Sequence, residues 1–236
     1  MRRLFNLKQR FPPLPATTIE ELQDLRAKWT DDRNLSGLSR IYTFSELKAR
    51  VEFQKWTSAS YGSLLLLKGK SSGMRTDDCW LSLSALDFYR SLPQSGNHIF
   101  VEMKPGTKAH KLVWTIICRL LEANPELAHD DLALQEMLHS DTWTTTDPAM
   151  PCMLLSKTFQ SFSDFVIVID RLDLCECSGV VFLPRLVEVV RSARSKVKML
   201  IVFEEMAPSK RIHREDISKD EEHLQIIQED QNKIRS

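Results

Sequence analysis

The feature that most constrains the fold is a set of short, mainly apolar runs. The clearest is residues 165–169, a run rich in β-branched residues that ends at Asp170. Runs of this length without polar alternation are typical of strands buried on both faces. Residues 64–67, 99–101 and 197–203 have the same character. The chain therefore predicts several buried strands.

Segments with apolar residues at helical spacing separate these runs. They lie at residues 76–92, 109–122, 153–162 and 182–193, with a shorter one at 132–138. Helical connections between strands call for a parallel sheet with helices on both faces, so the predicted fold class is α/β. Two further helical patterns, at 17–29 and 43–56, precede the first run.

The chain divides into three parts by composition. We expect an N-terminal arm and helix at 1–42, an α/β domain at 43–208 and a polar, charged tail at 209–236. The arm is basic and is interrupted by three prolines, which favours a plain basic arm over a mitochondrial presequence. The charge density of the tail favours a solvated end, with at most one polar helix, over a helix that binds a partner.

The composition excludes several classes of function. Basic and acidic residues number 32 each, so no net field recruits nucleic acid or a membrane. The five cysteines are scattered and odd in number, which favours reduced thiols in a cytosolic or nuclear setting over a disulfide framework, and we expect a cytoplasmic location. Cys175 and Cys177 lack a second pair at zinc-finger spacing, and the histidines form no spaced cluster. No apolar run is long enough to span a membrane.

A turn rich in small residues follows the run at 64–67 and supplies the candidate phosphate-binding residues. They are Gly69, Lys70, Ser71, Ser72, Gly73, Met74, Arg75 and Thr76. A loop between a strand and a helix N-terminus can bind phosphate through its backbone N–H groups. Against the pattern G-x-x-x-x-G-K-[ST], the first Gly and the final hydroxyl are kept, whereas Met74 replaces Gly and Arg75 replaces Lys.

The run at 165–169 places an acid where such a site needs one. Asp170 is the candidate Mg²⁺ ligand together with Thr76, and Asp173 is the candidate for positioning water. We expect residues 64–67 and 166–169 to be parallel neighbours, with Gly69 and Asp170 at the same edge of the sheet. The alternative for Asp170 is a solvated acid at the end of a strand.

Together these segments resemble the NACHT module of fungal STAND NTPases, including its nephrocystin-like variants. The similarity covers about residues 44–203 and rests on FQKW, LLLLKGKSSGMRT, NPEL, VIVIDRLDLC and KVKMLIVF. In that family the corresponding motifs include F-x-x-W, LLWIKGKPGSGKST and IDALDEC. The resemblance implies a P-loop NTPase-like parallel sheet, preceded by a short helical segment, that works as a nucleotide-binding switch between an effector domain and a repeat sensor.

The chain departs from the family pattern at the positions that would bind and hydrolyse the nucleotide. Met74 would crowd a phosphate, and the planar group of Arg75 is not interchangeable with a Lys ammonium. Arg171 stands where the family has a small residue, and Leu174 replaces the Glu of the acidic motif. The strand at 197–203 is followed by two glutamates instead of S-R. The resemblance therefore supplies no catalytic residue beyond the candidate Asp173.

Two functions remain open at this point. The first is a degenerate NACHT-type pseudo-NTPase that binds ATP or GTP with Mg weakly or not at all and acts as an interaction or regulatory module. Its partner would be a protein, such as an intact NACHT relative, and a truncated gene product is a further reading. The alternative is an active ATP- or GTP-binding signalling NTPase, with Lys70 or Arg75 on the phosphates, Thr76 and Asp170 on Mg²⁺, and Asp173 on water.

Overall fold

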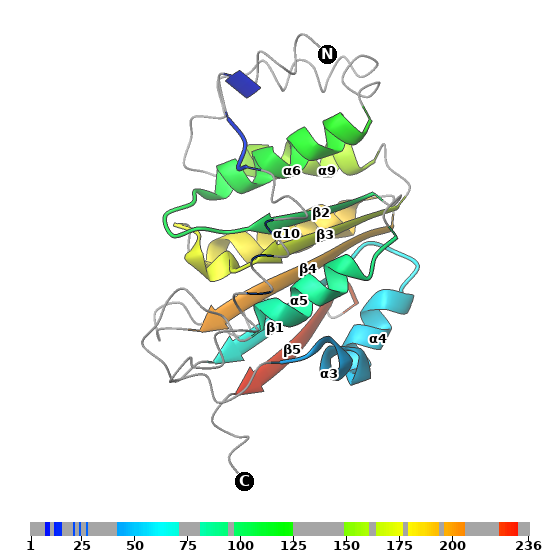
Figure 1. Cartoon of the computed structure of the whole chain (residues 1–236). Helices are drawn as coiled ribbons and strands as arrows, with labels where there is room; N and C mark the ends of the chain where they lie inside the picture. Colours follow the sequence, from blue (N-terminus) through cyan, green and yellow to red (C-terminus); the bar gives the residue numbers. More distant parts are fainter. Residues whose placement is uncertain are drawn as a thin grey trace.

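Five parallel strands form one sheet in the computed structural model, in the order β2-β3-β4-β1-β5 (Figure 1). They are β1 (Ser63–Lys70), β2 (His98–Glu102), β3 (Asp164–Asp170), β4 (Lys196–Glu205) and β5 (Leu224–Asp230). The structure describes residues 8–9, 12–15, 21, 24, 27, 42–70, 81–93, 97–124, 149–160, 164–176, 179–193, 196–205 and 222–230. The α/β class and the parallel sheet predicted from the sequence are confirmed.

Helices cover both faces of the sheet (Figure 1). One face carries α6 (Ala109–Ala123), α9 (Ala149–Phe159) and α10 (Gly179–Ser192), and the other carries α3 (Phe44–Ala49), α4 (Val51–Ser58) and α5 (Ser82–Arg90). The chain crosses the sheet in one direction through α5 and returns through α6, α9 and α10. Right-handed crossovers that run in opposite directions place their helices on opposite faces, so the position of α5 opposite α6, α9 and α10 follows from the strand order.

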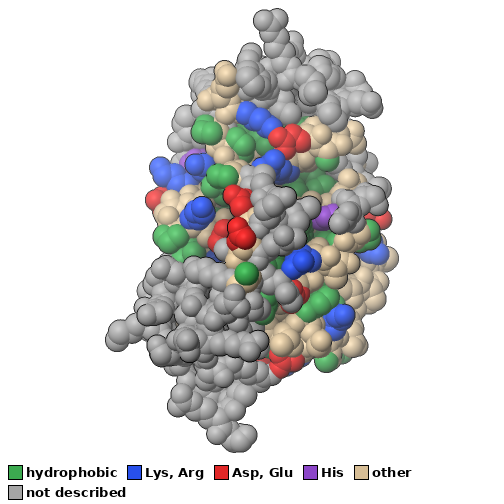
Figure 2. Space-filling model, in the orientation of Figure 1, with side chains coloured by type: hydrophobic (Ala, Val, Ile, Leu, Met, Phe, Trp, Pro, Cys, Tyr) green, Lys and Arg blue, Asp and Glu red, His purple; other side chains and the backbone are tan. Residues whose placement is uncertain are grey.

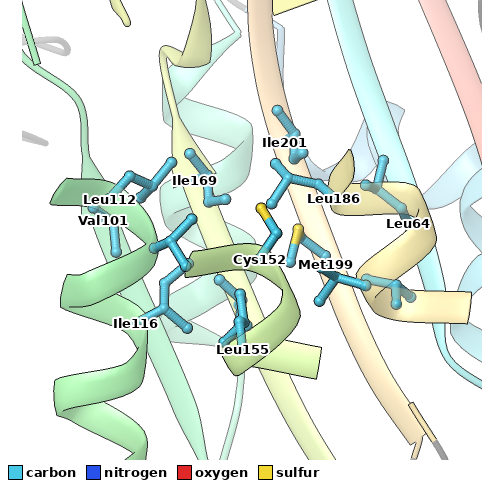
Figure 3. Packing of buried hydrophobic residues seen from close by; sticks show 14 of the residues in the cluster. Leu64, Val101, Leu112, Ile116, Cys152, Leu155, Ile169, Leu186, Met199 and Ile201 are labelled. Atoms are coloured by element: carbon cyan, nitrogen blue, oxygen red, sulfur yellow. The ribbon is translucent and has the colours of Figure 1, made fainter. Parts of the chain in front are cut away.

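Alternation along the strands divides the core into two hydrophobic clusters. In β1, Leu64 and Leu66 pack toward α6, α9 and α10, as Figure 3 shows for Leu64 and its neighbours, whereas Leu65 and Leu67 pack toward α3, α4 and α5. All four are fully buried. Each contributes about 2 kcal/mol through burial. A strand of this kind has to be apolar at every position, which is why the run at 64–67 lacks polar alternation.

The expected pairing of β1 with β3 is wrong. Strand β4 lies between them and pairs in parallel with both. The two strands still belong to one sheet and end at the same edge, because Gly69 lies opposite Glu204 while Ile169 lies opposite Ile201. Strands β1, β3 and β4 are equally apolar, so their sequences do not indicate which of them lies in the middle of the three.

Several boundaries also differ from expectation. The helix predicted at 43–56 is two helices, because Arg50 is extended and its guanidinium contacts Glu229 of β5 at 2.8 Å. Helices α9 and α10 begin earlier than predicted, and α5 begins at Ser82 rather than Thr76, with residues 71–80 outside the described part. The helix predicted at 132–138, and all but three residues of the one at 17–29, also lie outside it.

The expectation of a wholly solvated tail is wrong for residues 224–230. They form β5, which pairs with β1 and buries Leu224 and Ile227. Only two of its seven residues are buried apolar side chains, so this strand has a weaker sequence signal than β1 or β3. None of the helices among the described residues is long and apolar enough to cross a membrane.

Candidate functional site at the carboxyl edge of the sheet

The described residues of the predicted site lie at the carboxyl edge of the sheet. Gly69 and Lys70 belong to β1 and pair with both β4 and β5, so the strand continues two residues beyond Lys68, where the turn was expected to begin. Their backbone is thus part of the sheet and not of an open loop. Ser71, Ser72, Gly73, Met74, Arg75 and Thr76 lie outside the described residues.

Asp170 is buried at the end of β3. Its side chain is 1% exposed, and the Ser82 hydroxyl at the start of α5 donates to Oδ1 at 2.7 Å. Oδ2 is buried and has no hydrogen-bond partner among the residues that the structure describes. A solvated acid at the end of a strand is therefore excluded.

Burial also changes the ionisation of this carboxyl. It raises the pKa of Asp170 to about 7, although the Ser82 hydroxyl and the positive charge of Arg171 both act to lower it. Desolvation disfavours the charged form of a carboxyl and is the largest cause here. Near neutral pH a substantial fraction of Asp170 is therefore protonated, and a protonated carboxyl is a poor ligand for Mg²⁺.

Arg171 and Asp173 form a buried ion pair directly after β3. Nε of Arg171 lies 3.1 and 3.2 Å from the two carboxylate oxygens of Asp173, and Nη2 lies 2.9 Å from Oδ2. The backbone N–H of Glu204, near the end of β4, donates to Asp173 Oδ1 at 3.1 Å. Both oxygens of Asp173 are therefore occupied by groups of the same chain, which leaves this carboxylate poorly placed to position a water.

The same guanidinium reaches a second acid. Nη2 of Arg171 lies 3.5 Å from Oε2 of Glu204, and Arg171, Asp173 and Glu204 are each no more than 3% exposed. We call these residues the edge triad. Arg171 has φ 62° and ψ 50°, a left-handed conformation that costs a residue with a side chain about 1–2 kcal/mol. The packing of the triad has to offset this strain.

A second ion pair lies at the same edge of the sheet. Nζ of Lys68 in β1 lies 2.7 Å from Oε1 of Glu205 in β4, and both side chains are nearly buried. The two glutamates that follow the run at 197–203 are thus each matched with a cation from a neighbouring segment. They do not present an open negative surface at this edge.

The described residues at this edge do not by themselves make up a Mg²⁺–nucleotide site. Phosphoryl chemistry needs a cation directed at phosphate and a carboxylate available to the metal. Here Lys68 and Arg171 contact carboxylates of the same chain, and no group of three His, Cys, Asp or Glu side chains suited to a metal occurs in the described ranges. The three cysteines in those ranges, Cys118, Cys152 and Cys175, are buried and form no disulfide.

Sequence reasoning missed part of this site. Ser82 was expected within a helix, and nothing in its spacing marks it as the partner of Asp170. Lys68 stands one position before the candidate loop, and nothing in its position there marks it as the partner of Glu205. Arg171, Glu204 and Glu205 depart from the family pattern, and their opposite signs become a signal for pairing only once the strand order is known.

The comparisons with known proteins add no identity. A scan against models of protein families finds no match, and a search of curated proteins finds no relative.

Proposed function

We propose that the chain is a degenerate NACHT-type domain that acts as a pseudo-NTPase, serving as an interaction or regulatory module without efficient nucleotide turnover. The observation that carries the proposal is the edge triad, in which a buried guanidinium engages both oxygens of the acid that would position water. ATP or GTP with Mg would bind weakly or not at all.

The charges at the sheet edge support this proposal. A triphosphate site accumulates positive charge toward the ligand, because the bound phosphates carry several negative charges. The cations described at this edge are turned toward Glu204, Glu205 and Asp173, and Asp170 is partly protonated at neutral pH. An incoming phosphate would have to break buried ion pairs, and breaking such a pair costs several kcal/mol.

A protein partner fits this proposal better than nucleic acid or a membrane. On the face shown in Figure 2, basic and acidic side chains are interspersed among the described residues and do not form a patch of one sign. A surface of this kind gives no electrostatic attraction to phosphates or anionic lipids. The family resemblance suggests an intact NACHT domain as the partner and the cytoplasm as the location.

One observation favours the active alternative. Asp170 combines an oxygen that has no hydrogen-bond partner among the described residues with a hydroxyl neighbour, Ser82, at a helix N-terminus. A carboxylate and a hydroxyl are the protein ligands that P-loop proteins offer to Mg²⁺. In this alternative Mg²⁺ would have to displace the proton from Asp170, and Lys70 or Arg75 would serve the phosphates.

The two functions are separated by titrating a fluorescent ATP analogue with Mg²⁺ against the full chain and its Asp170→Asn variant. The proposal predicts no saturable binding by either at millimolar nucleotide. Saturable micromolar binding that is lost in the variant would overturn the proposal and support the active alternative. The double variant Met74→Gly/Arg75→Lys repairs the loop sequence alone, and we expect it to remain a poor binder because the edge triad is intact.

A further inference from the structure

We infer that Arg171 is a built-in cation, whose guanidinium holds the place between Asp173 and Glu204 that a divalent metal ion could otherwise take. This inference rests on the proposed function, because it explains how the edge is kept closed to a metal and its nucleotide. It predicts that removing the guanidinium turns the edge into a binding site for a divalent cation.

One nitrogen atom of Arg171, Nη2, faces both carboxylates. Nη2 of Arg171 lies 2.9 Å from Oδ2 of Asp173 and 3.5 Å from Oε2 of Glu204. These oxygens come from a short 3-10 turn, η2 (Leu172–Leu174), and from β4, and the Glu204 N–H bond to Asp173 ties the two segments together. A cation in the position of Nη2 would therefore face a carboxylate oxygen from each of two connected segments.

The burial of these groups makes a cation necessary. Asp173 is 3% exposed and Glu204 is 1% exposed. A buried carboxylate needs a counter-charge or hydrogen bonds, since otherwise it is strongly destabilising or becomes protonated. The Arg171 guanidinium contacts both carboxylates, so a cation that took its place would meet two negative charges.

Asp170 supplies a further buried carboxyl at this edge. It ends β3 beside β4, strand alternation places it on the same face of the sheet as Glu204, and its Oδ2 is buried without a hydrogen-bond partner among the described residues. Hard cations such as Mg²⁺ and Mn²⁺ are bound by one or two carboxylates and complete their shell with water. The edge without Arg171 would supply that number of ligands.

The left-handed conformation of Arg171 selects the best variant for the test. Glycine adopts φ near 62° without the steric cost that other residues carry. Arg171→Gly therefore removes the guanidinium and relieves backbone strain at the same time, which partly offsets the loss of the ion pairs. Arg171→Lys is the matched control, because it keeps a positive charge in the same place.

The experiment measures Mn²⁺ binding, with Mn²⁺ alone as the probe, by electron paramagnetic resonance of the free ion. The full-length wild type, Arg171→Gly and Arg171→Lys are compared. We expect Arg171→Gly to bind one Mn²⁺ at least about tenfold more tightly than either of the others, a difference of about 1.4 kcal/mol. Equal affinities in folded wild type and folded Arg171→Gly would overturn the inference.

A second measurement covers the case in which Arg171→Gly does not fold in the absence of metal. Its circular dichroism is then followed as Mn²⁺ is added, beside the variant Arg171→Gly/Asp173→Asn/Glu204→Gln, which lacks the buried charges. Refolding of Arg171→Gly by millimolar Mn²⁺, with no response in the neutral variant, supports the inference, and no refolding contradicts it. These tests contain no nucleotide, so they fail separately from the proposed function, which fails if the wild type binds Mg²⁺–ATP.

Discussion

The burial of Asp170 predicts an unusual dependence of stability on pH. Burial raises the pKa of Asp170 to about 7, against an ordinary value of 3.8. At pH values below the ordinary pKa, the carboxyl is protonated in both the folded and the unfolded chain, and it opposes folding least. As the pH rises through this interval, the unfolded chain releases its proton while the folded chain retains it, so the free energy of unfolding falls.

The size of the effect follows from the same two pKa values. Each pH unit within the interval costs about 1.4 kcal/mol, so the loss is complete near pH 7 at about 4 kcal/mol. Asp170→Asn keeps the shape of the side chain and an oxygen that can accept from Ser82, but it cannot ionise. The stability advantage of the variant over the wild type should therefore grow by about 2 kcal/mol between pH 5 and pH 7.

Urea unfolding of both proteins at a series of pH values measures this difference directly, because contributions from all other groups largely cancel. Asp164→Asn is the control, since it makes the same substitution at the exposed start of β3. A difference between Asp170→Asn and the wild type that stays constant from pH 5 to pH 7 would refute the reasoning. It would mean that the carboxyl reaches water in the folded chain.

Three further predictions concern the scaffold, each measured by urea unfolding. Lys198→Met should lower the free energy of unfolding by about 3 kcal/mol, because Nζ donates to the carbonyls of Trp56 and Ala59 and to the Ser63 hydroxyl. A decrease of less than about 1 kcal/mol would contradict this role. Gly62→Ala should cost about 2 kcal/mol, because the new Cβ would lie 2.4 Å from the carbonyl oxygen of Val190; an unchanged midpoint would show that α10 is less closely packed on β1. Thr43→Ala should cost about 1 kcal/mol through loss of the capping box with Glu46, and Thr43→Ser should restore it.

The sequence predicted those parts of the fold that depend on burial along a single segment. Strands β1, β3 and β4 are buried on both faces, and such strands must be apolar throughout, so their runs are visible without any other information. Helix α6 begins and ends close to its predicted bounds, because the turn residues Pro105 and Gly106 precede it and Asn124 and Pro125 follow its last turn. Each of these features can be predicted from the residues of a single segment.

The strand order and the pairing of the site residues depend on contacts between distant segments, which the sequence pattern does not show. The central place of β4 is set by its pairing with two strands, and neither pairing leaves a mark on the residues of β4 alone. At the candidate site, the sequence named Asp170 and Asp173, but their partners Ser82 and Glu204 come from other elements. Charges of opposite sign at Arg171 and Glu204 could have suggested a pair only once the strand order was known.

In the proposed function, the Arg171 guanidinium is held by Asp173 within the folded chain and remains there in the presence of nucleotide. The most direct test is the side-chain ¹⁵N–¹H resonance of Arg171 Nε, assigned by its absence in Arg171→Lys and followed as Mg²⁺–ATP or Mg²⁺–GTP is added. We predict a slowly exchanging Nε–H signal that keeps its position at millimolar nucleotide. A signal that is missing in the free protein, or that shifts and saturates at micromolar nucleotide, would contradict the account.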